Sequence, residues 1–495
     1  MVYIFCFNFA VSNLHGTMRE LRCFITLALL MLALTACVKS HHNFPPQDTT
    51  VRLDSTNLPI VWIEVDGDSI KRDTRVNAHM KIINNGAGQL NYADTLAHPG
   101  QHIDYNGYIA LRHRGNSTYN NSPKKPYSLR TLAEPMWRDV ATKHKVKLLG
   151  MGKDNNWALL APYSDKSLLR DALTFELAQP WMEYVPQGRH CELVLDGVYY
   201  GVYYLTEVVS KGHKRLNLKS PGDKGDALTG DYLMEIDCND DVTYTSKFHP
   251  IGANGTPYAD HNILFQFKSP DYDNLSQEQI AYITRRIDDM ERALASAAYR
   301  DPQRGYRKYI DELSFIDYQL IMELSHNVDA YRLSTKFYKR RDSEDPRFKM
   351  TVWDTDLAYG NAKHRQAWRT DTWMYQHNDI MNQEGEVYLV PFWWQRLNSD
   401  PHYTAMLKQR WAQYRQSNMS DERLMATVDS LAAVLTSHGA VTRDSQAWPR
   451  WGKWVWNNHY VSASYADEVA HLKQWLLQRT AWMDRQLGYQ PATAQ

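Results

Sequence analysis

Several features that would assign this chain to a common functional class are missing. Its 56 lysines and arginines equal its 56 aspartates and glutamates, so no overall positive charge favours nucleic acid as a partner. No His-Glu-x-x-His motif and no cysteine pair at ligand spacing predicts a zinc site, and no Gly-x-Ser-x-Gly elbow predicts a serine hydrolase. Internal repeats and low-complexity segments are also lacking. The remaining composition, 43% hydrophobic and 23% charged, is that of an ordinary globular protein.

Long apolar runs are scarce, and the one that stands out lies near the N-terminus. It covers residues 24–36, follows Arg19 and Arg22, and is too short to span a bilayer comfortably. The segment Leu34-Thr35-Ala36-Cys37 resembles a bacterial lipobox, in which the signal is cut before the cysteine and the thiol then carries lipid. A plain secretory signal with an incidental cysteine is the alternative. We expect an exported protein that is lipid-anchored in the bacterial cell envelope, with the anchor at Cys37 as its only membrane contact.

This signal defines the first boundaries of the chain. Residues 1–37 are expected to be removed or lipidated, and Met18 is the natural start of such a signal, which makes residues 1–17 a candidate start-site misassignment. Residues 38–57 are polar and are expected to form a flexible tether. Of five cysteines, Cys191 and Cys238 lie beyond the signal. In an exported protein these two could form a disulfide, and two buried free thiols are equally compatible with the sequence.

Hydrophobic periodicity divides the rest of the chain into a strand-rich half and a helical half. Strands are predicted at 59–65, 77–83, 107–114, 157–161, 191–195, 199–207, 230–237, 263–267, 336–338 and 348–352. Helices are predicted to open at Ser164 or Asp165 and to cover 276–296, 315–325, 401–415, 421–437 and 465–487. The order of elements predicts an α+β protein with a β-rich N-terminal lobe over 58–270 and a mainly helical C-terminal lobe over 271–490.

Tryptophan is abundant, with 16 residues that concentrate in the last third of the chain. Large rings at helical spacing are typical of core packing between helices. The other interpretation is an aromatic platform for carbohydrate. We favour core packing.

Three aspartates are the main candidates for chemistry. Asp329 follows a predicted helix in a loop, and Asp354 and Asp356 follow a predicted strand. If that strand continued, the last two side chains would point to opposite sides, so that one could bind metal while the other orients the loop. Phosphoryl-transfer enzymes use one carboxylate to orient or deprotonate a hydroxyl and others to hold Mg²⁺ on the nucleotide phosphates.

Basic residues in the first half could face those carboxylates. A polar loop with one glycine, Arg114-Gly115-Asn116-Ser117-Thr118, precedes Lys124 and Lys125. A single glycine does not make a Walker or kinase-type phosphate loop, and an exposed basic turn is the simpler interpretation. A buried lysine would need a carboxylate partner, for which Glu207 and Glu176 are the candidates.

Five segments, in order, resemble the spore-coat protein H (CotH) kinase-like family over residues 58–487. They are Arg114–Thr118 with Lys124–Tyr127, residues 157–167, Gly197–Tyr203, Asn327–Asp329 and Trp353–Gly360. The resemblance implies an atypical protein-kinase-like fold and transfer of the ATP γ-phosphate to serine or threonine of an envelope or secreted protein.

The resemblance also implies roles for individual residues. Asp329 matches the catalytic aspartate and Asp354 the metal-binding aspartate of the family, and Lys125 is the candidate phosphate-binding lysine. The family usually has asparagine five residues after the catalytic aspartate, where this chain has Ser334, a shorter and weaker ligand. Asp356 would then compensate as a second metal ligand. The expected nucleotide site also includes Lys124, Arg114 and Glu207.

Two alternatives follow from the expected compartment, because ATP is scarce outside the cytoplasm. The chain could be a catalytically weak or inactive kinase-like scaffold that binds glycan or protein in the cell envelope. A glycan hydrolase is the third hypothesis, because its paired carboxylates need no fixed sequence spacing.

Overall fold

The computed structural model describes residues 45–490 except 66, 68, 137–141 and 239. The expected signal, its lipobox and Cys37 lie outside the described residues. These described residues cluster as one compact unit.

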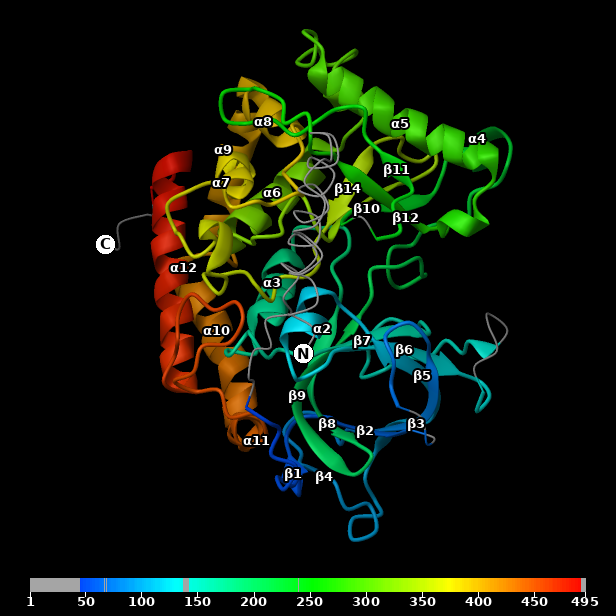
Figure 1. Ribbon diagram of the computed structural model, residues 1–495, viewed down its shortest axis with the longest axis vertical. Coiled ribbons are helices and arrows are strands. Elements are labelled where there is room, and N and C mark those ends of the chain that lie inside the picture. Colours follow the sequence, from blue (N-terminus) through cyan, green and yellow to red (C-terminus); the bar gives the residue numbers. More distant parts are fainter. Residues whose placement is uncertain (1–44, 66, 68, 137–141, 239, 491–495) are drawn as a thin grey trace, which may run out of the picture. The chain divides into compact units, whose positions relative to one another are not determined.

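Seven strands from the first half close into a barrel (Figure 1). In barrel order they are β2 (Ile60–Val65), β3 (Val76–Ile83), β5 (Ile103–His113), β6 (Tyr127–Leu132), β7 (Asn156–Leu160), β9 (Val198–Glu207) and β8 (Gly188–Leu195). All neighbours are antiparallel except β2 and β8, whose parallel pairing closes the barrel. Alternate apolar residues fill the interior, for example Val61 and Ile63 of β2 opposite Leu193 and Leu195 of β8. The short strands β1 (Ser55–Thr56) and β4 (Asn91–Tyr92) pair with each other.

The predicted hairpin in this barrel is confirmed. Its two strands are β8 and β9, and Asp196 and Gly197 between them have φ of 49° and 75°. Two consecutive left-handed residues make the tight turn whose twist matches the flanking strands, which is why Asp-Gly is favoured there.

A second sheet has five antiparallel strands in the order β11-β12-β10-β13-β14. These are β11 (Tyr244–Thr245), β12 (Leu264–Ser269), β10 (Tyr232–Ile236), β13 (Thr335–Lys339) and β14 (Phe348–Thr351). Strand β10 pairs with β13, with Met234 opposite Phe337. The sheet therefore joins chain from both sides of residue 270, and the predicted lobe boundary between residues 270 and 271 is wrong. The prediction places the charged strands β13 and β14 in a helical lobe, but β13 pairs with β10 on one side and with β14 on the other.

Most of the predicted helices are confirmed. The longer helices are α3 (Arg170–Ala178), α5 (Gln277–Ala295), α6 (Glu312–Ser325), α9 (Pro401–Arg415), α10 (Asp421–Thr436), α11 (Ala440–Ala447) and α12 (Tyr465–Leu487). Shorter ones are α2 (Ser117–Asn121), α4 (Gly225–Leu228), α7 (Asn378–Gln383) and α8 (Trp393–Asn398), with 3₁₀ turns at 272–274, 306–308, 364–366 and 374–376. Ser276 begins α5 with a capping box to Gln279, which explains its sharp start. Helices α8 and α11 were missed because each spans only one or two turns.

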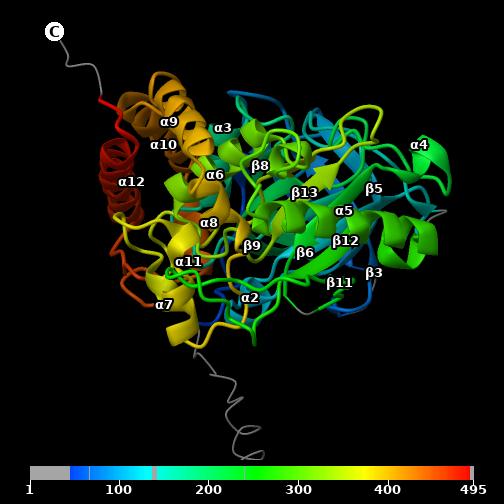
Figure 2. The ribbon, with the colours of Figure 1, turned by 90° about the horizontal axis from the view of Figure 1, so that it is seen from above.

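Helix α6 is the centre of the second half. It packs against β14 on one side and against α9 and α12 on the other, so almost its whole circumference is buried. Figure 2 shows α9, α10 and α12 gathered on the side of α6 away from the strands. A rigid, buried helix of this kind fixes the position of the loop that follows it, which contains Asp329.

Helix α3 begins later than predicted. Neither Ser164 nor Asp165 caps it, because the helix starts at Arg170. The Asp165 carboxylate instead accepts a hydrogen bond from the Arg170 backbone N–H at 2.9 Å and pairs with the Arg170 guanidinium. Asp165 therefore accepts backbone hydrogen bonds, as a capping residue does, but it stabilises the turn that precedes the helix.

Tryptophan packing follows the core interpretation. Trp393, Trp394, Trp411, Trp448 and Trp475 are buried, whereas Trp368 and Trp454 are partly exposed at the surface. Cys191 is buried and Cys238 is half-buried, and both are free thiols, so the disulfide alternative is wrong.

Within the described residues no single helix is long and apolar enough to cross a membrane, and α10 with α11, bent by 69°, meets that test only as a pair, by length and composition.

Candidate functional site

The loop after α6 brings the two central motifs together. Helix α6 ends at Ser325, and His326 reverses the chain with a left-handed φ of 46°. Asn327 then donates a hydrogen bond from its side-chain amide to the Asp354 carbonyl at 3.0 Å. Asp329 lies two residues further, with its side chain 23% exposed. The segment that follows β14 is therefore fixed directly beside the Asp329 loop.

Asp354 and Ser334 face each other across this junction. The Ser334 hydroxyl donates to Asp354 Oδ2 at 3.0 Å, and both residues have left-handed φ values, 47° and 61°. Such backbone conformations are costly for residues other than glycine and are found where function fixes the geometry. Because β14 ends at Thr351, the strand does not continue through Asp354 and Asp356. The condition under which their side chains would point to opposite sides is therefore not met, and both carboxylates interact electrostatically with each other and with Asp171 in one acidic cluster.

The glycine-bearing loop of the barrel half covers this cluster. Gly115, with φ of 77°, turns the chain from β5 into α2. Thr118 in α2 then donates to Asp356 Oδ2 at 3.5 Å, a long contact. The Arg114 guanidinium lies 5.2 Å from the centre of the Trp353 ring and interacts electrostatically with Asp354 and other carboxylates of the cluster.

A fourth carboxylate, Asp171, was not predicted. It lies in the first turn of α3 and accepts hydrogen bonds at Oδ1 from the Thr355 N–H at 2.8 Å and from the Thr355 hydroxyl at 3.0 Å. Thr355 lies between the two predicted aspartates, so α3 is fixed to the same turn. An acidic residue in the first turn of a helix could have indicated Asp171. A helix that begins at Ser164 or Asp165, as predicted, puts Asp171 beyond its first turn.

The acidic cluster, defined as Asp171, Asp329, Asp354 and Asp356, carries more negative charge than its surroundings neutralise. Burial and repulsion from Asp354 raise the pKa of Asp171 to about 7. Desolvation by the surrounding protein, with repulsion from Asp354 and Asp171, raises the pKa of Asp356 well above its usual range. Desolvation and Asp329 also raise the pKa of Asp354, while Arg114 opposes the shift. Asp354 nevertheless presents surface to solvent, so a cation can reach it.

Asp329 has an environment of its own at the edge of the cluster. Burial raises its pKa, and the Arg332 guanidinium, 2.9 Å from Oδ1, opposes that shift. A carboxylate with a raised pKa is a better proton acceptor than an ordinary aspartate and remains ionised near neutral pH when a cation is adjacent.

A lysine that was not predicted, Lys336, pairs with a carboxylate close to the acidic cluster. Its ammonium lies 2.6 Å from Glu235 Oε1, and Lys268 lies 3.4 Å from the other oxygen of Glu235. Lys336 also opposes the rise in the pKa of Asp354 and lies 6.0 Å from the centre of the Trp353 ring. The available signal was the single charge in the otherwise apolar strand β10, Glu235, because a buried charge needs a partner.

Three predicted nucleotide-site residues contact groups other than the acidic cluster. Lys124 is fully buried, and its ammonium contacts the Val202 carbonyl at 2.6 Å and Asp444 at 2.7 Å. Lys125 donates to the Tyr119 carbonyl and lies over the Tyr119 ring. Glu207 accepts hydrogen bonds from Gly152, Tyr184 and Gln187, and no contact joins it to Lys124 or Lys125 among the described residues.

These positions correct the prediction. The sequence showed basic residues near a glycine loop but not the direction of their side chains. Lys124 points toward α11 and is already paired, and Glu207 is a hydrogen-bond acceptor in the barrel. Glu176, the other candidate partner for a lysine, is exposed on α3. Of the predicted basic residues, Arg114 is the one that reaches the acidic cluster.

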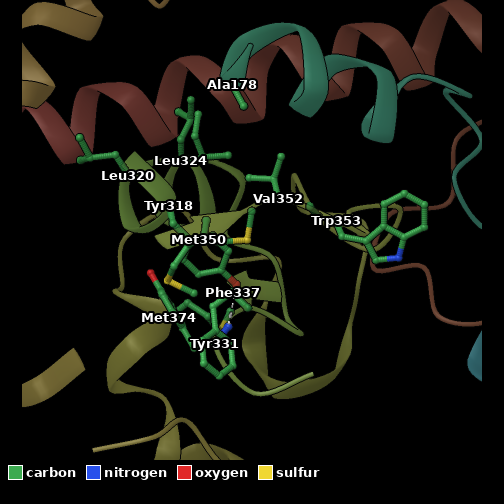
Figure 3. Packing of buried hydrophobic residues seen from close by; sticks show 14 of the residues in the cluster. Ala178, Tyr318, Leu320, Leu324, Tyr331, Phe337, Met350, Val352, Trp353 and Met374 are labelled. Carbon is green, nitrogen blue, oxygen red and sulfur yellow. Dashed lines mark hydrogen bonds between the residues drawn. The ribbon is translucent and has the colours of Figure 1, made fainter. Parts of the chain in front are cut away.

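The cluster rests on a dense apolar core. Figure 3 shows Val352 among Leu324, Met350 and Ala178, with the Trp353 ring set apart from this group. Val352 is fully buried and Trp353 nearly so. The chain thus leaves β14 by burying one side chain in the core and placing the next beneath Arg114, immediately before the acidic residues begin.

The described residues do not contain three or more His, Cys, Asp or Glu side chains arranged to hold a metal ion by themselves. A Mg²⁺ ion bound with a nucleotide needs only one or two carboxylates, because phosphates and water supply the other ligands. Asp354 and Asp356 fit that requirement, and a cation beside them would relieve the repulsion between carboxylates that helps to raise their pKa values. Within the described part of the chain, Arg114 Nη1 is buried and makes no hydrogen bond, so the site retains a donor for an anion.

Comparison with models of protein families identifies the family of this chain. A family model described as CotH kinase protein matches residues 111–483, which is most of the chain and includes every member of the acidic cluster. The chain belongs to the CotH kinase family. A comparison with curated proteins found no match. Membership in the CotH family supports a kinase-like function on a mixed α+β fold.

Proposed function

We propose that this CotH-family protein transfers the γ-phosphate of ATP to a serine or threonine hydroxyl of another protein, with Mg²⁺. The observation that carries the proposal is the convergence of Asp329, Asp354 and Asp356 on one side of a junction whose other side is formed by Arg114. These residues come from the two halves of the chain and have no common local reason to meet.

Each group has a distinct part in the proposed reaction. Asp354 and Asp356 would hold the cation, and the Ser334 hydroxyl would keep the Asp354 carboxylate oriented. Arg114 would face the phosphates, with Lys336 further along the same side. Bound Mg²⁺ would neutralise charge on the phosphates during transfer.

Asp329 would accept the proton of the acceptor hydroxyl. The hydroxyl oxygen forms a bond to the γ-phosphorus while the bond from that phosphorus to the β-bridging oxygen breaks, and ADP leaves. The partial exposure of Asp329 suits this role, because the carboxylate must be reachable by a protein substrate.

We also propose that the protein is exported and anchored by lipid at Cys37, which would make envelope or secreted proteins its substrates. The test is Cys37→Ser, which is expected to move the protein from the membrane fraction to the soluble fraction. Continued association of the variant with membranes would contradict the anchor.

The decisive experiment is phosphate transfer from ATP labelled at the γ-position to envelope proteins, using the full-length protein. We expect magnesium-dependent label on serine or threonine, reduced to background by Asp354→Asn. Asp226→Asn, a surface change on α4, is the matched control and should retain transfer. If the wild type transfers nothing but is stabilised by soluble glycans, and Asp329→Asn leaves that stabilisation unchanged, the protein is instead a kinase-like binding scaffold.

A further inference from the structure

Arg332 is a buried arginine whose guanidinium contacts the Asp329 loop and a second segment of the chain. It is 1% exposed and three residues after Asp329. Its Nη2 donates to Asp329 Oδ1 at 2.9 Å, and its Nε donates to the Val328 carbonyl at 3.0 Å. One planar group therefore holds both the carboxylate and the backbone of the same loop.

The other end of this guanidinium binds a segment that is more than 50 residues away in the chain. Nη1 lies 2.9 Å from Glu386 Oε2 and 3.2 Å from the Tyr388 carbonyl. The free oxygen of Glu386 accepts from the N–H groups of Val387 and Tyr388, so the carboxylate is itself fixed.

The chain of charges continues beyond Glu386. Arg365 Nη2 lies 3.3 Å from Glu386 Oε2, and Arg365 Nη1 lies 3.1 Å from Glu384 Oε2. Asp329, Arg332, Glu386, Arg365 and Glu384 thus form a ladder of alternating sign. The ladder joins the Asp329 loop to residues 365–386, which follow Asp354 and Asp356 in sequence.

We propose that Arg332 is a positioning residue that sets the orientation of Asp329 through its attachment to Glu386. The expected effect on kcat rests on the proposed function, whereas the attachment of the Asp329 loop to Glu386 does not. Asp329 lies in a loop, and its carboxylate would otherwise sample several rotamers. Arg332 restricts it to one, and Glu386 restricts Arg332, so the segment at 384–388 contributes to the geometry of transfer without contacting a substrate.

Lysine should not replace Arg332. An ammonium retains the charge but cannot bind a carboxylate, a backbone carbonyl and a second carboxylate in one plane. Arg332→Lys thereby separates geometry from charge. A displacement of about 1 Å at a reacting group can cost about 10²-fold in rate.

The test compares Arg332→Lys with Arg415→Lys in the full-length protein. Arg415 is the matched control, because it is 3% exposed and paired with Asp484 far from the acidic cluster in sequence. We expect Arg332→Lys to lower kcat about 10²-fold while KM for ATP stays within about twofold. Glu386→Gln should lower kcat about tenfold, as is common for groups that orient another residue. Arg415→Lys should destabilise the fold without changing kcat.

Hydrogen exchange supplies a measurement that does not depend on activity. We expect residues 326–334 and 384–388 to exchange faster together in Arg332→Lys and in Glu386→Gln, and to be unchanged in Arg415→Lys. Unchanged exchange in both segments would overturn the inference, whether or not the wild type is active. If exchange rises but the wild type transfers no phosphate, the attachment stands and the proposed function fails. If exchange rises, the wild type is active and kcat is unchanged, the positioning role fails.

Discussion

Two charged regions of this molecule contrast sharply. In the first, Asp444 lies between Lys124, at 2.7 Å, and Arg450, at 2.7 Å, with all three side chains almost completely buried. Its one carboxylate has two cations, and the pKa of Asp444 is lowered. The acidic cluster has four carboxylates, and Arg114 and Lys336 are the cations that act on Asp354. The pKa values of all four carboxylates are raised.

The difference separates a structural ion pair from a candidate site of chemistry. A buried charge that serves only the fold is neutralised by its neighbours, because an unpaired one costs several kcal/mol. The acidic cluster is not neutralised by the described residues around it. An excess of negative charge next to accessible surface is what a cation-binding site requires. The same comparison explains why Lys124, a reasonable candidate from sequence, is a poor one in the structure.

The largest expected effect is on the reaction itself. Asp329→Asn should lower phosphate transfer by about 10²- to 10⁴-fold, because the amide cannot accept the hydroxyl proton. Binding of ATP with Mg²⁺, measured by thermal stabilisation, should be nearly unchanged. Equal phosphorylation by wild type and variant would remove Asp329 from its proposed role.

A change in the Lys124–Asp444 ion pair should affect the stability of the fold and leave nucleotide binding intact. Lys124→Met should cost about 3 kcal/mol of unfolding free energy, because Asp444 loses one cation and the Val202 carbonyl loses its donor. Urea unfolding measures this cost, and nucleotide stabilisation should persist in the folded variant. Loss of nucleotide stabilisation in folded Lys124→Met protein would erase the distinction between the two regions.

The unbalanced cluster predicts a pH dependence of stability with a definite sign. Asp171 has a folded pKa of about 7, above its unfolded value of about 3.9. The folded state therefore binds the proton more tightly, and stability should fall as pH rises from about 4 to about 7.

Thermal unfolding across that pH range checks this sign. Asp171→Asn should flatten the dependence, because the amide does not titrate. Mg²⁺ should also flatten it in the wild type, since a bound cation favours the ionised carboxylates. A wild-type profile that rises with pH, with no difference in Asp171→Asn, would contradict the assigned charge imbalance.

The smallest expected effect concerns the residue by which this chain departs from the family pattern. Ser334→Asn should lower the Mg²⁺ concentration needed for half-maximal transfer several-fold, because the amide oxygen reaches further than the hydroxyl. Asparagine tolerates the left-handed φ of 47° at this position. Ser334→Ala is the control and should raise that concentration. Identical magnesium dependence in all three proteins would exclude a role for this position.

Much of the secondary structure follows from local sequence. Helices α9 and α12 have the predicted bounds, because their apolar faces are long and their ends carry capping residues. The Asp196-Gly197 hairpin follows from turn chemistry alone. Closure of the barrel does not follow from local sequence. The β2–β8 pairing joins residues about 130 positions apart, such as Ile60 and Glu192.

The candidate site was predictable only in part, for the same reason. Asp329 and Asp354 were recognised from short motifs. Asp171 and the Lys336–Glu235 pair were missed, since their significance lies in contacts made after folding, the latter between residues 101 positions apart. Lys124 was misjudged because sequence gives a residue type and not a side-chain direction.

The most direct test is thermal unfolding with ATP and Mg²⁺ together, compared with either alone. We predict a rise in Tm for the wild type that requires both, is lost in Asp354→Ala, and is kept in Lys124→Met. Saturating ligand should contribute about 3 kcal/mol at a concentration 100 times Kd. No rise at millimolar nucleotide, or an equal rise in Asp354→Ala, would contradict a nucleotide site at the acidic cluster.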